Sequence, residues 1–234
     1  RRITRKYLLE HKYFTVDNWV KKCKAENKKL ILDFGCGTGG VSLPFLKAGI
    51  KTVSMDASFG MVNKLREKVK LFKLECYCVV GDAENLPFKN GSFDALTCAG
   101  VLHHISDIKK GLAEQLRVLK ENGLLFISEP FMDSPGISHI YKFIIKIGKK
   151  VFRLFKGKSL ETLESPLSSF DLRCIIDILN ESAVETRFSF LAYWPFVFGY
   201  LPDFLGYPLL TLINLFKEPG KGDTVIICAR KKHG

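Results

Sequence analysis

The stretch LILDFGCGTGG, residues 30–40, is an apolar run that ends in an acid and then breaks into glycines. It predicts a strand at residues 30–34 followed by a tight turn into a helix. Gly35, Gly37 and Gly40 also satisfy the G-x-G-x-x-G spacing, which alone is a weak match to a dinucleotide-binding loop. The segments that follow must therefore decide which ligand this turn would hold.

From residue 30 to residue 130, short β-branched or apolar runs alternate with longer periodic stretches, the pattern of βαβ units in a parallel sheet. Helices are predicted near residues 40–48, 58–73 and 107–121, the last closed by Asn122-Gly123 as a left-handed cap. A further helix is predicted at residues 168–180. We predict strands at residues 30–34, 52–56, 76–82, 93–99, 124–129, 184–192 and 224–230.

The whole-chain composition limits the class of protein. A chain of 234 residues is long enough for one α/β domain with some additions, and we expect a single domain. Its seven cysteines include no C-x-x-C pair, which favours a reduced, cytoplasmic setting and predicts no metal site. No stretch has the order of a signal peptide. The net charge of +12 favours an anionic partner, either nucleic acid or a membrane surface.

Acidic residues stand at the ends of three successive predicted strands. Asp33 lies two residues before the first glycine, where it would repel a pyrophosphate but suit a ligand with an ammonium and a sulfonium; the alternative is an acid that caps its own loop. Asp56 is placed to accept both ribose hydroxyls. Asp82 could accept from an adenine amine while the Ala83 amide donates to the ring. S-adenosylmethionine meets all of these requirements.

On these residues, the sequence resembles the class I S-adenosylmethionine-dependent methyltransferases, specifically their broad small-molecule group (type 11-like). The resemblance implies an α/β fold with a Rossmann-like, mostly parallel sheet of seven strands in the order 3-2-1-4-5-7-6, the last antiparallel, with helical cap insertions. The segments that carry it are LDFGCGTGG (32–40), GDAENLPF (81–88), FDALTCAGVLHHISD (93–107) and RVLKENGLLFISEP (117–130).

The resemblance also implies the cofactor and its site. S-adenosyl-L-methionine would be bound and S-adenosyl-L-homocysteine released. The implied contacts are the glycine loop, the ribose acid and its neighbour, a methionine that packs on the adenine, the adenine contact itself, and the backbone beside the methionine part. These positions are Asp33, Gly35, Cys36, Gly37, Gly39, Asp56, Ala57, Met61, Asp82, Ala83, Ala99 and Gly100.

Three residues are candidates for catalysis. His103 and His104 follow the fourth strand, and Glu129 ends the fifth beside the expected methyl position. The alternatives are orienting or packing roles for the histidines and a loop cap for the glutamate. Methyl transfer is an in-line displacement on an activated sulfonium, so alignment can supply much of the rate. A general base matters only when the acceptor is a hydroxyl or a protonated amine.

The second half differs in texture. Residues 140–156 carry an aliphatic and a basic stripe that are two residues apart, about 200° around a helix. Such a basic amphipathic helix suits an anionic lipid surface, and a cap helix with a solvated lysine face is the alternative. Residues 189–216 contain Asp203 as their only charge. Prolines argue against one membrane-spanning helix there, so we expect an apolar hairpin at residues 193–217, with a homodimer interface as the alternative.

These observations define the predicted organisation. Residues 1–234 would form a single methyltransferase domain, with an N-terminal helical lead (1–29), a cap insertion (131–182) and the apolar hairpin (193–217) between strands six and seven. The predicted function is methyl transfer to a small or lipid-like acceptor by a cytoplasmic, peripherally membrane-associated enzyme. RNA methylation and a catalytically silent S-adenosylmethionine-binding protein are the alternatives. Cys98 is expected to be a core thiol, because no proline precedes it.

Overall fold

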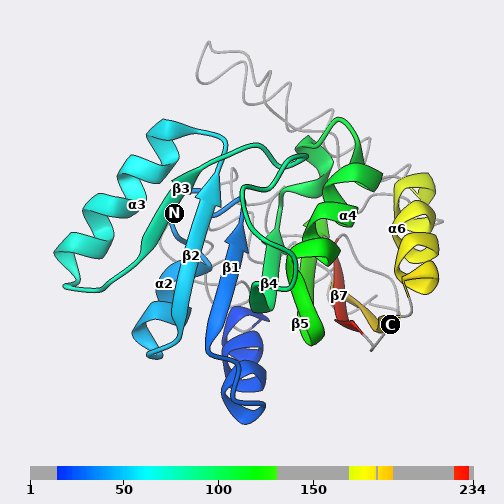
Figure 1. The fold of residues 1–234 in the computed structure, drawn as a ribbon, viewed down its shortest axis with the longest axis horizontal. Coiled ribbons are helices and arrows are strands. Elements are labelled where there is room, and N and C mark those ends of the chain that lie inside the picture. Colours follow the sequence, from blue (N-terminus) through cyan, green and yellow to red (C-terminus); the bar gives the residue numbers. More distant parts are fainter. Residues whose placement is uncertain (1–14, 131–168, 183, 192–223, 232–234) are drawn as a thin grey trace, which may run out of the picture.

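The computed structural model describes residues 15–130, 169–182, 184–191 and 224–231. Seven strands in this part of the chain form one sheet, in the order β3-β2-β1-β4-β5-β7-β6 (Figure 1). The first five strands pair in parallel, while β7 is antiparallel to both β5 and β6. This confirms the predicted order. The strands are β1 (Leu30–Phe34), β2 (Lys51–Asp56), β3 (Tyr77–Val80), β4 (Phe93–Ala99), β5 (Leu119–Pro130), β6 (Val184–Leu191) and β7 (Thr224–Lys231).

Helices cover both faces of the sheet (Figure 1). Residues 15–25, within the predicted N-terminal lead, are helical. No helix among the described residues is long and apolar enough to cross a membrane. The other helical elements are α2 (Ser42–Lys47), α3 (Phe59–Leu71), the 3₁₀ turn η1 (Leu102–His104), α4 (Ile108–Val118) and α6 (Ser169–Glu181).

The core is built from strands that are apolar on both faces. Leu125 and Ile127 of β5 belong to the cluster beneath α4 and α6. Their neighbours Leu124 and Phe126 point to the opposite face and belong to the cluster under α2 and residues 15–25. On that face, the ring of Trp19 stacks on Phe126 with 5.4 Å between centroids. The continuous apolar runs are therefore explained by burial on two sides.

The structure corrects the end of the helix predicted at residues 107–121. α4 ends at Val118 rather than near residue 121, and Asn122-Gly123 lies inside β5. Asn122 does have the expected left-handed conformation, with φ of 57°. The pair forms an irregularity in the strand rather than a helix cap, because the pairing between β4 and β5 shifts register at this point.

Within the predicted cap insertion, the structure describes α6. α6 lies within residues 131–182, yet its Leu172, Ile175 and Leu179 are buried in the same cluster as residues of α4. This helix is therefore part of the layer that covers the sheet. The remainder of that insertion, including the basic stretch 140–156, and the predicted hairpin 193–217 lie outside the described residues.

Candidate active site

The turns that carry the predicted cofactor residues lie along one edge of the sheet. Because β1 to β4 are parallel neighbours, their carboxyl ends meet at the same edge, where ligands bind in open α/β sheets. Asp56 at the end of β2 lies beside Val80 at the end of β3, and Phe34 at the end of β1 lies beside Cys98 in β4. The glycine turn, Asp56 and the loops that follow β3 and β4 are thus brought together.

The glycine turn needs glycine for both conformation and space. Gly35, Gly37 and Gly39 have φ values of 68°, 50° and 89°, in the left-handed region that other residues rarely adopt. A Cβ atom on Gly35 would clash with Val101, and one on Gly39 would clash with Leu65. The left-handed glycines are therefore the three predicted for the methyltransferase loop, rather than the set required by the dinucleotide spacing.

Asp56 connects the glycine turn to the start of α3. One carboxylate oxygen accepts a hydrogen bond of 2.8 Å from the Gly37 backbone N–H, and the other accepts one of 2.8 Å from the Ser58 N–H. Each carboxylate oxygen has a further lone pair, so both can also accept from ribose hydroxyls. The side chain thus lies at the carboxyl end of β2, where it holds the glycine turn, and its contact with a ribose stays a prediction.

Exposed apolar side chains surround this edge. Met61, the predicted adenine-packing residue, is 40% exposed in the first turn of α3, and Phe59 beside it is 62% exposed. Val80, which ends β3, is 45% exposed. Exposed large apolar side chains that lie next to polar groups often mark a binding surface.

Asp33 is engaged inside the protein. It is almost fully buried, and its carboxylate accepts hydrogen bonds from the hydroxyls of Ser42 and, at 2.9 Å, of Thr97. The Ser54 hydroxyl donates in turn to Ser42 over 2.7 Å. The carboxylate thus ties the start of α2 to β4 beneath the glycine turn. These contacts give Asp33 a supporting role inside the protein, and its contact with the ligand stays a prediction.

Asp82 lies in the β3–β4 loop, residues 81–92. Its carboxylate accepts a hydrogen bond of 2.9 Å from the Glu84 backbone N–H and one of 2.9 Å from the Asn85 side-chain amide. These two bonds, the first being the stronger influence, lower the pKa of Asp82 below its ordinary value. Asp82 is exposed and Ala83 is half-buried, so the predicted adenine contacts lie at the surface of this loop.

Glu129 lies buried at the end of β5, where two backbone N–H groups, the Cys98 thiol and the His103 imidazole converge on its carboxylate. One oxygen accepts from the backbone N–H groups of Val101 and Leu102, at 2.7 and 2.9 Å. The other oxygen is 2.7 Å from Nδ1 of His103, whose side chain is only 5% exposed. The ring of His104 lies 4.0 Å from that of His103, and His104 itself is exposed. Glu129 is therefore placed to orient His103 rather than to reach an acceptor directly.

Cys98 lies beneath this pair. It is completely buried, and burial raises the pKa of its thiol well above the ordinary value. The residue is a core thiol, as its sequence context predicted. Among the residues described, no group of His, Cys, Asp and Glu side chains is arranged to hold a metal ion.

Several contributing residues had no role in the sequence prediction. Thr97 and Ser42 hold Asp33, while Arg117 and Glu114 of α4 hold the β3–β4 loop. The sequence alone could have indicated a role for Thr97, because it is a polar residue within an apolar strand. Arg117 stands in the segment RVLKENGLLFISEP, which carried the family resemblance but suggested no contact for it.

Comparison with known proteins shows what part of this chain is similar to. The family model described as a methyltransferase domain matches residues 32–127. A demethylmenaquinone methyltransferase of Renibacterium salmoninarum is 38% identical over 99 residues, which are 42% of this chain and 40% of that protein. The chain thus covers less than half the length of this curated relative.

Solved structures extend the likeness in fold. The YcgJ protein from Bacillus subtilis superimposes with a TM-score of 0.65 at 19% identity, over 95% of this chain and 100% of that one. The cyclase SpnF superimposes with a TM-score of 0.61 at 20% identity, over 88% and 75% of the two chains. At such identities the likeness shows the fold alone.

Proposed function

We propose that this chain, whose residues 32–127 match the family model described as a methyltransferase domain, is a class I S-adenosylmethionine-dependent methyltransferase that transfers a methyl group to a small or lipid-like acceptor. The observation that carries the proposal is the gathering of the glycine turn, Asp56 and Asp82 along one edge of the sheet, with the Glu129–His103 pair following the neighbouring strands. The relative named for demethylmenaquinone supports an acceptor of the lipid-like kind.

The residues at this edge suit the cofactor. Asp56 would accept the ribose hydroxyls, and Asp82 with Ala83 would contact the adenine. The left-handed glycines allow the backbone to approach the ligand closely, and Ala99 and Gly100 would flank its methionine part. Bound S-adenosylmethionine would supply a methyl group on a sulfonium that is already activated for displacement.

The Glu129–His103 pair would remove a proton from the acceptor. When Nδ1 of the neutral imidazole carries the proton and donates it to the Glu129 carboxylate, Nε2 is the unprotonated nitrogen. A nitrogen in that state can accept a proton from a hydroxyl or an ammonium as methyl transfer proceeds. In this arrangement His103 is the proposed base and Glu129 is a positioning residue.

A transfer assay tests the acceptor class. The full chain is incubated with S-adenosylmethionine that is labelled in its methyl group. We expect it to transfer the label to molecules of a total lipid extract and not to total RNA. The physical reason is the absence of the Asn/Asp-Pro-Pro-aromatic sequence that grips a base amine, together with the apolar second half of the chain. Label that appears only in RNA would overturn this acceptor class and support the RNA alternative.

The same assay separates an enzyme from a cofactor-binding protein. The fold is shared with a cyclase, so it does not by itself establish methyl transfer. A silent protein would bind S-adenosylhomocysteine in calorimetry yet transfer no label to lipid, RNA or a small-molecule acceptor panel. Measurable transfer to any of these acceptors would exclude that alternative.

We further propose that the protein is cytoplasmic and associates reversibly with anionic membranes through residues 140–156. The support is the sequence pattern of opposed basic and aliphatic stripes. Each basic residue close to an anionic surface contributes about 1 kcal/mol, falling off over a Debye length. We expect co-sedimentation with anionic vesicles at low salt and little with zwitterionic vesicles.

Charge reversal tests this association. Changing Lys142, Lys146, Lys149 and Arg153 together to Glu should abolish vesicle binding. A matched control changes four exposed lysines of the described domain to Glu, giving the same change in net charge: Lys64, Lys70, Lys73 and Lys109. Equal loss of binding in both variants would show that general net charge, and not this stretch, drives the association.

A further inference from the structure

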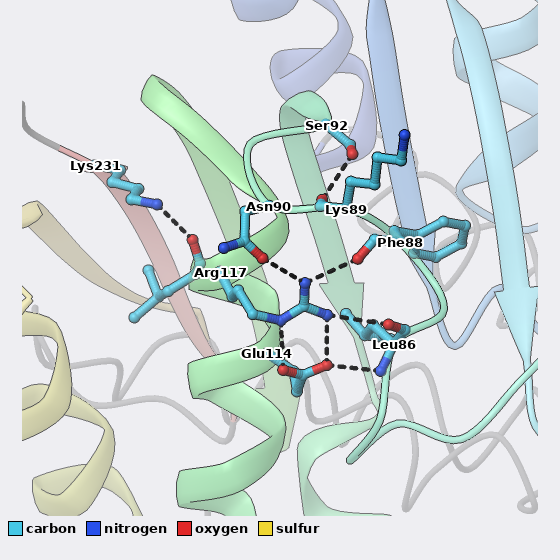
Figure 2. Close-up of polar contacts among 9 residues, drawn as sticks. Leu86, Phe88, Lys89, Asn90, Ser92, Glu114, Arg117 and Lys231 are labelled. Carbon is cyan, nitrogen blue, oxygen red and sulfur yellow. Dashed lines mark hydrogen bonds and ion pairs between the residues drawn. The ribbon is translucent and has the colours of Figure 1, made fainter.

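The guanidinium of Arg117 fastens the β3–β4 loop to α4 (Figure 2). It donates to the Leu86 carbonyl at 3.0 Å, to the Phe88 carbonyl at 2.8 Å and to the Asn90 side-chain oxygen at 2.8 Å. It also donates to both oxygens of Glu114, at 2.6 and 2.8 Å. Glu114 completes the connection by accepting a hydrogen bond of 2.7 Å from the Leu86 N–H.

The chemistry of this cluster requires arginine. A guanidinium presents five donors in a rigid fork, whereas a lysine ammonium is a single point charge that cannot reach acceptors so arranged. The Arg117 side chain is 31% exposed and that of Glu114 is 20% exposed, so the pair is partly shielded from water. The hydrogen bond from Arg117 is the main reason that the pKa of Glu114 lies below its ordinary value.

A second connection joins the same loop to the start of α4. The Asp107 N–H, at the N-cap of this helix, donates to a carboxylate oxygen of Glu84 over 3.1 Å. Glu84 is two residues from Asp82, whose carboxylate accepts from the Glu84 N–H. The adenine-contact residues 82 and 83 therefore directly precede two attachments of this loop to one helix, at residue 84 and at residues 86–90.

α4 is held to the sheet independently of Arg117. Lys231 of β7, which Figure 2 shows beside α4, donates through its ammonium to the Leu116 carbonyl at 2.7 Å and to the Leu119 carbonyl at 2.9 Å. Leu112 and Leu116 are buried in the cluster beneath this helix. Removing the Arg117 side chain should consequently release the loop while the helix stays in place.

We propose that the Arg117–Glu114 pair is a positioning device for cofactor recognition, which holds the β3–β4 loop so that Asp82 and Ala83 are already placed to contact the adenine. The proposal rests on the proposed function. Preorganisation of this kind increases affinity because the loop need not be ordered when the ligand binds. Arg117 then acts on the adenosyl part of the cofactor alone.

Calorimetry with two ligands tests this inference. Arg117→Ala should weaken the binding of S-adenosylhomocysteine and of methylthioadenosine, which lacks the amino-acid part, by a similar factor of about ten. Arg117→Lys should bind both ligands nearly as weakly as Arg117→Ala, because a lysine keeps the positive charge but lacks the forked set of donors. Lys120→Ala serves as the matched control, because Lys120 lies three residues after Arg117 and forms an ion pair with Asp94 instead of with the loop residues 86–90. This variant should bind both ligands like the wild type.

Hydrogen exchange on the cofactor-free chain supplies the second readout. The Leu86 amide should exchange faster in Arg117→Ala, while amides of the β5 strand stay protected. Unchanged affinity for both ligands, or loss for S-adenosylhomocysteine alone, would overturn the proposal. If Arg117→Ala does not fold, Glu114→Gln provides the test, with an expected loss of about threefold. A wild type that binds neither ligand refutes the proposed function, and exchange at Leu86 then still reports whether the attachment exists.

Discussion

Replacing Asp56 with alanine is expected to weaken the binding of S-adenosylhomocysteine by about a hundredfold. The carboxylate has two roles at this edge of the sheet. It accepts hydrogen bonds from the Gly37 and Ser58 N–H groups, and we propose that it also accepts hydrogen bonds from both ribose hydroxyls. A hydrogen bond to a charged group contributes about 1.5–3 kcal/mol, and each tenfold change in affinity corresponds to about 1.4 kcal/mol. Loss of the ribose contacts together with loosening of the glycine turn accounts for the expected factor.

Isothermal titration calorimetry measures this effect directly. Glu67→Ala is the matched control, because it removes an exposed carboxylate from α3, the helix that follows Asp56, and should leave the affinity unchanged. Asp56→Asn should fall between the control and the alanine variant, since an amide oxygen can still accept a hydrogen bond but carries no charge. Wild-type affinity in Asp56→Ala would refute the assignment of this edge as the cofactor site.

Glu129→Gln should lower the rate of methyl transfer by about a hundredfold to a thousandfold while the cofactor still binds. A glutamine at this position would keep its oxygen towards the N–H groups of Val101 and Leu102 and turn its amide nitrogen towards His103. That nitrogen is a donor, so Nδ1 of His103 would have to accept and the proton would move to Nε2. The imidazole would then be held in the tautomer that cannot accept a proton from the substrate.

Single-turnover rates at saturating cofactor, together with S-adenosylhomocysteine affinity, test this prediction. Glu129→Ala should also destabilise the fold, because the N–H groups of Val101 and Leu102 lose their acceptor in a mostly buried site, at about 1–3 kcal/mol for each. The glutamine variant keeps an acceptor for these N–H groups, so its effect on the rate reports the tautomer of His103 and not a loss of stability. Full activity in Glu129→Gln would show that His103 is a packing residue and that alignment alone supplies the rate.

The sequence by itself determined the fold and the edge of the sheet at which the candidate site residues lie. Buried strands such as LILDF and FDALTCA form continuous apolar runs because both of their faces are covered, and their alternation with helices predicts a parallel sheet. Parallel strands place their carboxyl ends together, so the glycine turn, Asp56 and Asp82 could be predicted to lie along one edge before any geometry was known. These patterns involve residues that are close together in the chain, so they can be recognised from the sequence alone.

The tertiary structure alone decided what each polar side chain touches. Asp33 meets Thr97 across 64 positions of the chain, and Glu129 meets His103 across 26. The spacing of residues along a strand reveals which face they share, but not which hydroxyl or imidazole from another element arrives opposite them. For the same reason, Asn122-Gly123 was correctly expected to adopt a left-handed turn but wrongly placed at a helix end. Whether that turn closes a helix or interrupts a strand depends on the β4–β5 pairing, which only the folded sheet supplies.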